Sequence, residues 1–181
     1  MAQTCIVGYH GTSESSANLI LQQNCFHPSE TSHEWLGKGV YFFEDRNHAI
    51  GWANIRSKRE HSGNAVVIAA DISCNEGEIF DLDMPQNVIE LENFYKQSLK
   101  FFKEGAPQFK NVHEVRCFWS DYYKETHPNI KVMAYTFEST EHVFAGFAIK
   151  QRQLCVKDHS VISNIRKVYT AQTSKGGYYR G

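Results

Sequence analysis

The feature that most constrains this chain is a continuous apolar run, AVVIAADIS, from Ala65 to Ser73. A run of this length without polar alternation predicts a strand that is buried on both faces. The chain has 181 residues, with 41% hydrophobic and 22% charged residues, which is a globular composition long enough to build a core around such a strand. We therefore expect a single domain of ordinary size, over residues 1–169.

Shorter patterns predict the elements around this run. Strands are expected at 5–10, 39–43, 131–138, 143–149 and 153–157, and helices at 13–23, 46–60, 87–105 and 112–125. Strands flank the chain and helices lie between them, which favours an α+β fold with a twisted, largely antiparallel sheet. The helical region at about 87–127 would be an insertion, and the tail 170–181 has little to bury and is expected to be flexible.

Charge and cysteine content limit the kinds of partner and the cellular compartment that we expect for the protein. The formal net charge is −1, so no broad basic field indicates a nucleic acid or an anionic membrane. No apolar run approaches the roughly 20 residues that cross a bilayer, and the N-terminus does not resemble a signal peptide. The five cysteines, an odd number without C-x-x-C spacing, are Cys5, Cys25, Cys74, Cys117 and Cys155. They predict buried, reduced thiols, a reducing compartment and hence a cytoplasmic location.

The segment YHGT, from Tyr9 to Thr12, places a histidine and a glycine at the end of the first predicted strand. A glycine lets a ligand approach the backbone closely, so Gly11 can offer its N–H and C=O to an amide. His10 can form a hydrogen bond with a sugar hydroxyl. The alternative for the same residues is an ordinary surface turn.

The segment GKGVYFF follows, and a helix comes directly after it. Gly37 and Gly39 match neither the Walker pattern nor G-x-G-x-x-G, so we interpret them as a turn that leads into a strand. Tyr41 lies on that strand and Trp52 on the helix. A strand that leads into an adjacent helix can place two such rings around one flat ligand, and stacking adds about 0.5–1.5 kcal/mol beyond the buried area.

Together, the residues from Tyr9 to Ala53 resemble the nicotinamide-binding half of the diphtheria-toxin-like ADP-ribosyltransferases, with the poly(ADP-ribose) polymerases as the closest pattern. The resemblance implies the split sheet of that fold, with NAD as the substrate. It implies that His10 contacts the adenosine-side ribose, that Gly11 binds the carboxamide, and that nicotinamide lies between the two aromatic rings. The NAD-binding residues would be His10, Gly11, Thr12, Gly39, Tyr41, Ala49 and Trp52. Lys38 would be the basic residue of the Gly-Lys-Gly segment.

Two positions depart from the family pattern. Ala49 stands where the family often has a serine that binds the carboxamide, and Gln153 stands where it has a catalytic glutamate. Breaking the nicotinamide–ribose bond develops positive charge on the ribose, which a carboxylate stabilises and a glutamine amide does not. By resemblance the catalytic residues would be His10, Tyr41 and Gln153, unless Glu138 or Glu141 supplies the carboxylate.

The expected function is mono-ADP-ribosylation of a macromolecular acceptor, protein or nucleic acid, with release of nicotinamide. A short free-standing transferase of this kind would suit a toxin or conflict effector, which a neutralising partner protein would accompany. Three alternatives stay open: a catalytically silent module that binds NAD or ADP-ribose, an RNA 2′-phosphotransferase, and a structural or interaction protein. No H-E-x-x-H motif and no paired Cys/His spacing indicates a metal, so none is expected.

Overall fold

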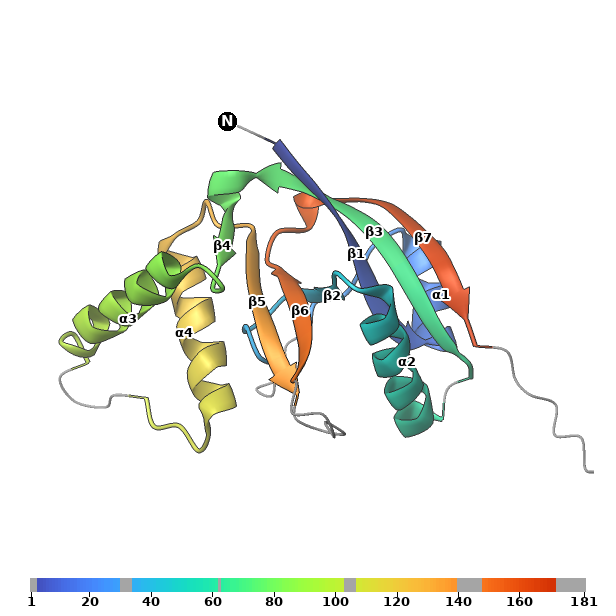
Figure 1. Cartoon of the computed structure of the whole chain (residues 1–181), viewed down its shortest axis with the longest axis horizontal. Coiled ribbons are helices and arrows are strands. Elements are labelled where there is room, and N and C mark those ends of the chain that lie inside the picture. Colours follow the sequence, from blue (N-terminus) through green and yellow to red (C-terminus); the bar gives the residue numbers. More distant parts are fainter. Residues whose placement is uncertain (1–2, 30–33, 62, 103–106, 140–147, 172–181) are drawn as a thin grey trace, which may run out of the picture.

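The computed structural model describes residues 3–29, 34–61, 63–102, 107–139 and 148–171. These residues form one seven-stranded sheet in the order β4-β5-β6-β2-β1-β3-β7 (Figure 1). The strands are β1 (Gln3–Ser13), β2 (Val40–Phe43), β3 (Ala65–Asn75), β4 (Ile79–Asp81), β5 (Val132–Ser139), β6 (Ile149–Val156) and β7 (Ile162–Thr170). The helices are α1 (Glu14–Gln23), α2 (Arg46–Glu60), α3 (Pro85–Leu99) and α4 (Val112–Thr126), with short 3₁₀ turns at Glu76–Glu78 and His159–Val161. Only β4 and β5 pair in parallel within these ranges, so the expected α+β class with a largely antiparallel sheet is confirmed.

The apolar run forms β3, as expected, and lies between two long partners. It pairs with β1 from Gln3↔Asn75 to Ser13↔Ala65, and with β7 on its other side. Val66 and Ile68 pack in the cluster that includes α1, whereas Val67 packs in the cluster that includes α2. Because alternate residues of a strand point to opposite faces, β3 is buried on both, as its composition predicts.

Helices cover both faces of the sheet. On one face α1 packs over β1, β3 and β7, with Ala17 and Ile20 in the core cluster. On the other face α2 covers β1 and β3, and α4 covers the part of the sheet built from β4, β5 and β6. Figure 1 shows α2 in front of β1 and β3, with α3 and α4 together beyond β5. On this face the region under α2 and the region under α4 meet at β2, the middle strand of the sheet.

Several boundaries differ from the sequence expectations. The helix expected to end at Gly105 ends at Leu99, where the Lys100 N–H donates to the carbonyl of Gln97 and the Phe101 N–H to that of Ser98, which tightens the last turn. Strands β4 and β7 were not expected, because β4 has only three residues and β7 alternates weakly and lies at the sheet edge. The expected strand at 143–149 and the tail fall mostly outside the described residues, although Thr170 belongs to β7.

Candidate functional site

The sheet order brings the three predicted motif segments onto neighbouring strands. The YHGT segment ends β1, the VYFF segment is β2, and Gln153 lies on β6, with β2 in the middle. Phe43 pairs with Tyr9 of β1 on one side and with Gln153 of β6 on the other. Residues separated by more than a hundred positions in sequence therefore meet in the centre of the sheet.

The sheet is nearly split between β1 and β2. Among the described residues these strands pair at one register position, Tyr9↔Phe43, whereas β1 pairs with β3 along its whole length. Continuing that antiparallel register would set Gly11 opposite Tyr41.

A side chain bridges the split where the backbone pairing stops. The Nδ1 atom of His10 lies 2.8 Å from the carbonyl oxygen of Tyr41. A carbonyl only accepts hydrogen bonds, so Nδ1 carries the proton and Nε2 presents a lone pair. Burial lowers the pKa of His10 and the charge of Arg56 lowers it further, although the bond to Tyr41 opposes both. The imidazole is therefore a neutral acceptor at Nε2, which suits a sugar hydroxyl.

Gly11 lies directly beneath α2. A Cβ atom at this position would be 2.1 Å from the carbonyl oxygen of Ala49 and 2.9 Å from the backbone nitrogen of Ala53. Ala49 and Ala53 are fully buried on the inner side of α2. The glycine and the two alanines thus let a helix touch a strand, a packing role that the sequence also allows and that the resemblance did not include. Thr12, the next residue, is buried as well.

The start of α2 is defined by its cap. Asp45 has extended backbone angles, and its side chain accepts a hydrogen bond of 2.7 Å from the backbone N–H of Asn47. Aspartate is one of the residues that favour this N-cap position. From this start, the i, i+4 spacing turns Ala49 and Ala53 inward and leaves Trp52 42% exposed.

The ring of Tyr41 packs on the face covered by α4, in the cluster with Leu36 and Cys155. Its hydroxyl donates to the carbonyl of Gly37 at 2.6 Å and accepts from the N–H of Leu36 at 2.9 Å. Burial and the neighbouring Cys155 raise the pKa of the Tyr41 hydroxyl far above its ordinary value. Tyr41 and Trp52 form no ring contact in the described part of the chain, so a sandwich would need Trp52 to turn over the bound ligand.

The Gly-Lys-Gly turn is held from α4 and β6. Asp121 accepts hydrogen bonds from the Lys38 N–H at 2.8 Å and from the Lys157 ammonium at 2.9 Å. Gly37 has φ +78, and a Cβ atom there would lie 2.2 Å from the Asp121 carboxylate. At Gly39 a Cβ atom would lie 2.5 Å from the sulfur of Cys155. A side chain at either glycine would therefore clash with these neighbouring groups. The Lys38 side chain between them is exposed.

Gln153 pairs with Phe43 of β2 and with Tyr135 of β5, so the three side chains lie on the same face of the sheet. Glu138 belongs to the other face, because its β5 neighbour Phe137 packs with the α4 cluster. Glu138 pairs with Lys150 at 3.7 Å, so it does not stand in for a carboxylate at Gln153. Glu141 lies outside the described residues.

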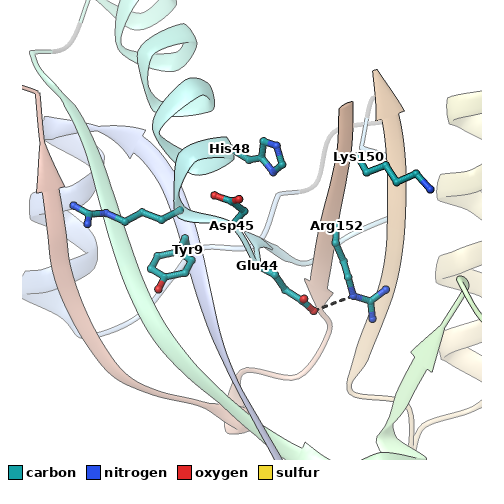
Figure 2. A pocket seen from close by; sticks show the side chains of 7 residues that line it. Tyr9, Glu44, Asp45, His48, Lys150 and Arg152 are labelled. Carbon is teal, nitrogen blue, oxygen red and sulfur yellow. Dashed lines mark hydrogen bonds and ion pairs between the residues drawn. The ribbon is translucent and has the colours of Figure 1, made fainter. Parts of the chain in front are cut away.

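A cavity of about 460 Å³ lies beside the end of β2 (Figure 2). Figure 2 shows His48 on the α2 side and Lys150 on the β6 side, with Glu44 reaching Arg152 below. Its lining consists of Tyr9, Glu44, Asp45, Arg46, His48, Lys150 and Arg152. These residues carry both signs of charge, so the cavity suits a polar ligand and is not a simple anion site.

Sequence reasoning missed Arg152 of the inner strand β6, which gathers three carboxylates around its guanidinium. Its guanidinium bonds the carboxylates of Glu44 at 2.9 Å and Asp81 at 2.9 Å, and also that of Asp83. Burial disfavours the charge, but these hydrogen bonds outweigh it and raise the pKa of the guanidinium. The only available signal was an arginine directly before the strand predicted at 153–157, next to Gln153.

The described residues contain no group of three or more His, Cys, Asp or Glu side chains placed to hold a metal ion. No helix in the described ranges is long and apolar enough to cross a membrane.

Comparison with known proteins gives little functional information. The chain is 34% identical over 90 residues to an uncharacterised protein of Methanocaldococcus jannaschii. The aligned part is 49% of this chain and 42% of that protein, so the chain spans less than half of this relative's length. No protein-family profile matches the chain, and no solved structure matches it.

Proposed function

We propose that this protein is an NAD-dependent mono-ADP-ribosyltransferase that binds the nicotinamide end of NAD at the split between β1 and β2. The observation that carries the proposal is the His10–Tyr41 bond across an otherwise unpaired stretch. A split sheet of the ADP-ribosyltransferase type, implied by the resemblance, agrees with this arrangement. We therefore include this fold type, together with the transferase activity, in the proposal.

In this proposal each residue has a chemical role. His10 accepts a ribose hydroxyl at Nε2, and the backbone of Gly11 binds the carboxamide across from Tyr41. Tyr41 forms one wall of the nicotinamide site. The adjoining polar cavity of about 460 Å³ is within the usual size range of ligand pockets and provides room for the rest of the dinucleotide.

The reaction breaks the bond between C1′ of the ribose and the pyridinium nitrogen. The bonding pair leaves with nicotinamide, which becomes neutral, and the acceptor atom forms a new bond to C1′ and loses its proton to water. Gln153 orients the ribose by hydrogen bonding but supplies no charge. A missing electrostatic group of this kind lowers rates by about 10²–10³, so slow turnover is expected.

A second candidate, a silent NAD or ADP-ribose binding module, is favoured by the same Gln153. The two are separated by incubating the protein with NAD labelled in the nicotinamide ring, measuring saturable binding and then released nicotinamide. Binding with release supports the transferase, and binding without release supports the silent module. His10→Ala should weaken NAD binding, whereas the exposed His27→Ala should not. Absence of NAD binding by the wild-type protein would reject both functions.

A further inference from the structure

Positive charge is concentrated on helix α2. Its fifteen residues include four basic side chains and one acidic side chain, although the whole chain has a formal net charge of −1. By contrast, α3 and α4, the two helices of the inserted hairpin, each have one more acidic than basic side chain. The basic side chains of α2 are Arg46, Arg56, Lys58 and Arg59. The helix that borders the proposed NAD site is therefore the basic one of these three.

Two of the four basic side chains are engaged within the protein and two are not. Arg56 pairs at 2.6 Å with the one acidic residue of the helix, and Arg46 donates to the carbonyl of Val168 on β7 at 2.7 Å. Lys58 and Arg59 are exposed, and neither forms an ion pair within the part of the chain that the structure describes. Both charges are therefore available to an anionic partner.

Two large apolar side chains lie exposed on the same helix. Trp52 is 42% and Ile55 49% exposed. Together with His48 and Arg59 they have the i, i+4, i+7, i+11 spacing that places side chains along one stripe of a helix, and we call these four residues the α2 stripe. His48 lies near Phe43 of β2, with 6.1 Å between ring centroids, and lines the cavity of about 460 Å³ (Figure 2). The α2 stripe therefore faces β2 and borders the proposed NAD site.

An exposed aromatic ring beside unpaired cations suits a single-stranded nucleic acid. Bases stack on such rings whatever their sequence, and a neighbouring lysine or arginine contacts the phosphates. Trp52 takes part in no ring contact among the described residues, so both its position and its exposure leave it available for a base. A duplex is a poorer match, because its base faces are hidden in the stack.

Two other anionic partners match the α2 stripe less well. A helix that lies on a membrane inserts a whole apolar face, whereas the inner side of α2 is buried on the sheet through Ala49 and Ala53. An acidic protein would pair with Lys58 and Arg59, but it would have no specific use for the Trp52 ring. The combination of charge and ring therefore favours nucleic acid.

We propose that the α2 stripe binds a single-stranded nucleic acid, with a base stacked on Trp52 and the adjacent phosphates held by Lys58 and Arg59. That this strand is also the acceptor of ADP-ribose rests on the proposed function, whereas the binding does not. In the transfer, a base nitrogen forms the new bond to C1′ and loses its proton to water, and nicotinamide leaves with the bonding pair.

Fluorescence anisotropy without NAD tests the surface itself. The probes are fluorescein-labelled oligothymidylate and oligouridylate strands and a duplex of the same length. We expect saturable binding of a single strand and weaker binding of the duplex, and the tighter of the two single strands identifies the sugar. Trp52→Ala should weaken binding by about five- to hundredfold, because a stacked base is lost. Trp52→Phe keeps a ring and should recover most of that loss.

The charge contribution has a separate readout. Arg59→Gln should weaken binding and reduce the slope of log Kd against log salt concentration by about 0.7, as the loss of one phosphate contact does. Lys96→Gln, which removes an exposed charge from α3, is the matched control and should change neither quantity. The proposal is overturned if neither strand binds to the wild-type protein, if Trp52→Ala binds as tightly as the wild type, or if polyglutamate binds as tightly as the strands.

The role as acceptor is tested with NAD labelled in the adenine ring. Transfer of label to the bound strand supports this role, and release of nicotinamide without label on a strand that binds would overturn it. If no nicotinamide is released at all, the transferase proposal fails, and the α2 stripe is still judged by the oligonucleotide affinities.

Discussion

His10 is the residue on which the candidate site depends most directly. Its ring lies against Phe26 and Phe42 at centroid distances of 5.3 and 6.0 Å, while its Nδ1 reaches across to Tyr41. A charged imidazolium would lose hydration there, so the folded protein holds the neutral form. This has a consequence for stability that can be measured without knowing any ligand.

Acidification should destabilise the protein partly through His10. Because the pKa of His10 is lowered below 6.5 in the folded state, the unfolded chain binds the proton more readily. Its contribution is fully present above pH 6.5 and is lost as the pH falls toward the folded pKa, at up to about 1.4 kcal/mol per pH unit.

Urea denaturation at pH 7.5 and 5.5 measures this effect. His10→Phe should lose less stability between the two pH values than the wild type, whereas the exposed His27→Gln should lose as much as the wild type. The same loss in His10→Phe and wild type would show that His10 does not titrate as described.

Gln153 allows a gain-of-function test of the proposed chemistry. Gln153→Glu restores a carboxylate beside the ribose, and nicotinamide release should rise by about 10² or more. Gln151→Glu is the matched control, because Gln151 lies on the same face of β6, opposite Phe137, and should leave the rate unchanged. A Gln153→Glu protein that binds NAD but releases nicotinamide no faster would argue against Gln153 lying at the ribose.

At the scale of elements, the contact between α2 and β1 is unusually close. The backbone of α2 at Ala49 lies where a side chain at position 11 would begin. The sequence indicates this close contact through three small residues, Gly11, Ala49 and Ala53. The resemblance implies ligand contacts for Gly11 and Ala49 and no packing role.

Gly11→Ala should separate these elements and destabilise the protein by about 2–3 kcal/mol, since neither backbone can yield to the added methyl group. Gly51→Ala on α2 is the control. It meets nothing within 4 Å and should stabilise the helix by about 0.5–1 kcal/mol. Thermal and urea denaturation of both variants measures the difference. A Gly11→Ala protein as stable as the wild type would mean that α2 sits less tightly on β1.

The main helices and strands follow from local pattern, but the edges of the sheet do not. β3, α2 and α4 were expected almost to the residue, because apolar periodicity and caps act over short distances. The short strand β4 is held by pairing with β5 and by the Arg152 cluster, which are distant in sequence. Such strands have no local signal strong enough to predict.

At the scale of the whole molecule, a partly buried ion pair ties α4 of the inserted hairpin to the motif region. The Lys157 side chain is 3% exposed, and its ammonium bonds Asp121 of α4 and the carbonyl of Leu36. Asp121 also holds the backbone of Lys38. The insertion therefore fixes the turn that leads to Tyr41.

Asp121→Asn should leave the Lys157 charge inadequately paired. We expect a loss of about 2–3 kcal/mol, below the usual value of about 3–5 for a fully buried pair because Asp121 is 28% exposed. The double variant Asp121→Asn with Lys157→Met should recover part of the loss. Glu138→Gln, in an exposed pair, should change stability by less than about 0.5 kcal/mol. Equal effects of Asp121→Asn and Glu138→Gln in urea denaturation would contradict this account.

The sequence by itself determined the buried strand at Ala65, the capped helix after Asp45, and the order of the YHGT and GKGVYFF segments, because these depend on neighbouring residues. Only the tertiary structure decided that Gln153 lies beside Phe43, that His10 bonds the carbonyl of Tyr41, and that Asp121 of the helical insertion holds the Gly-Lys-Gly turn. Those relations depend on the pairing of distant strands and the seating of helices on them, and no short stretch of sequence specifies either.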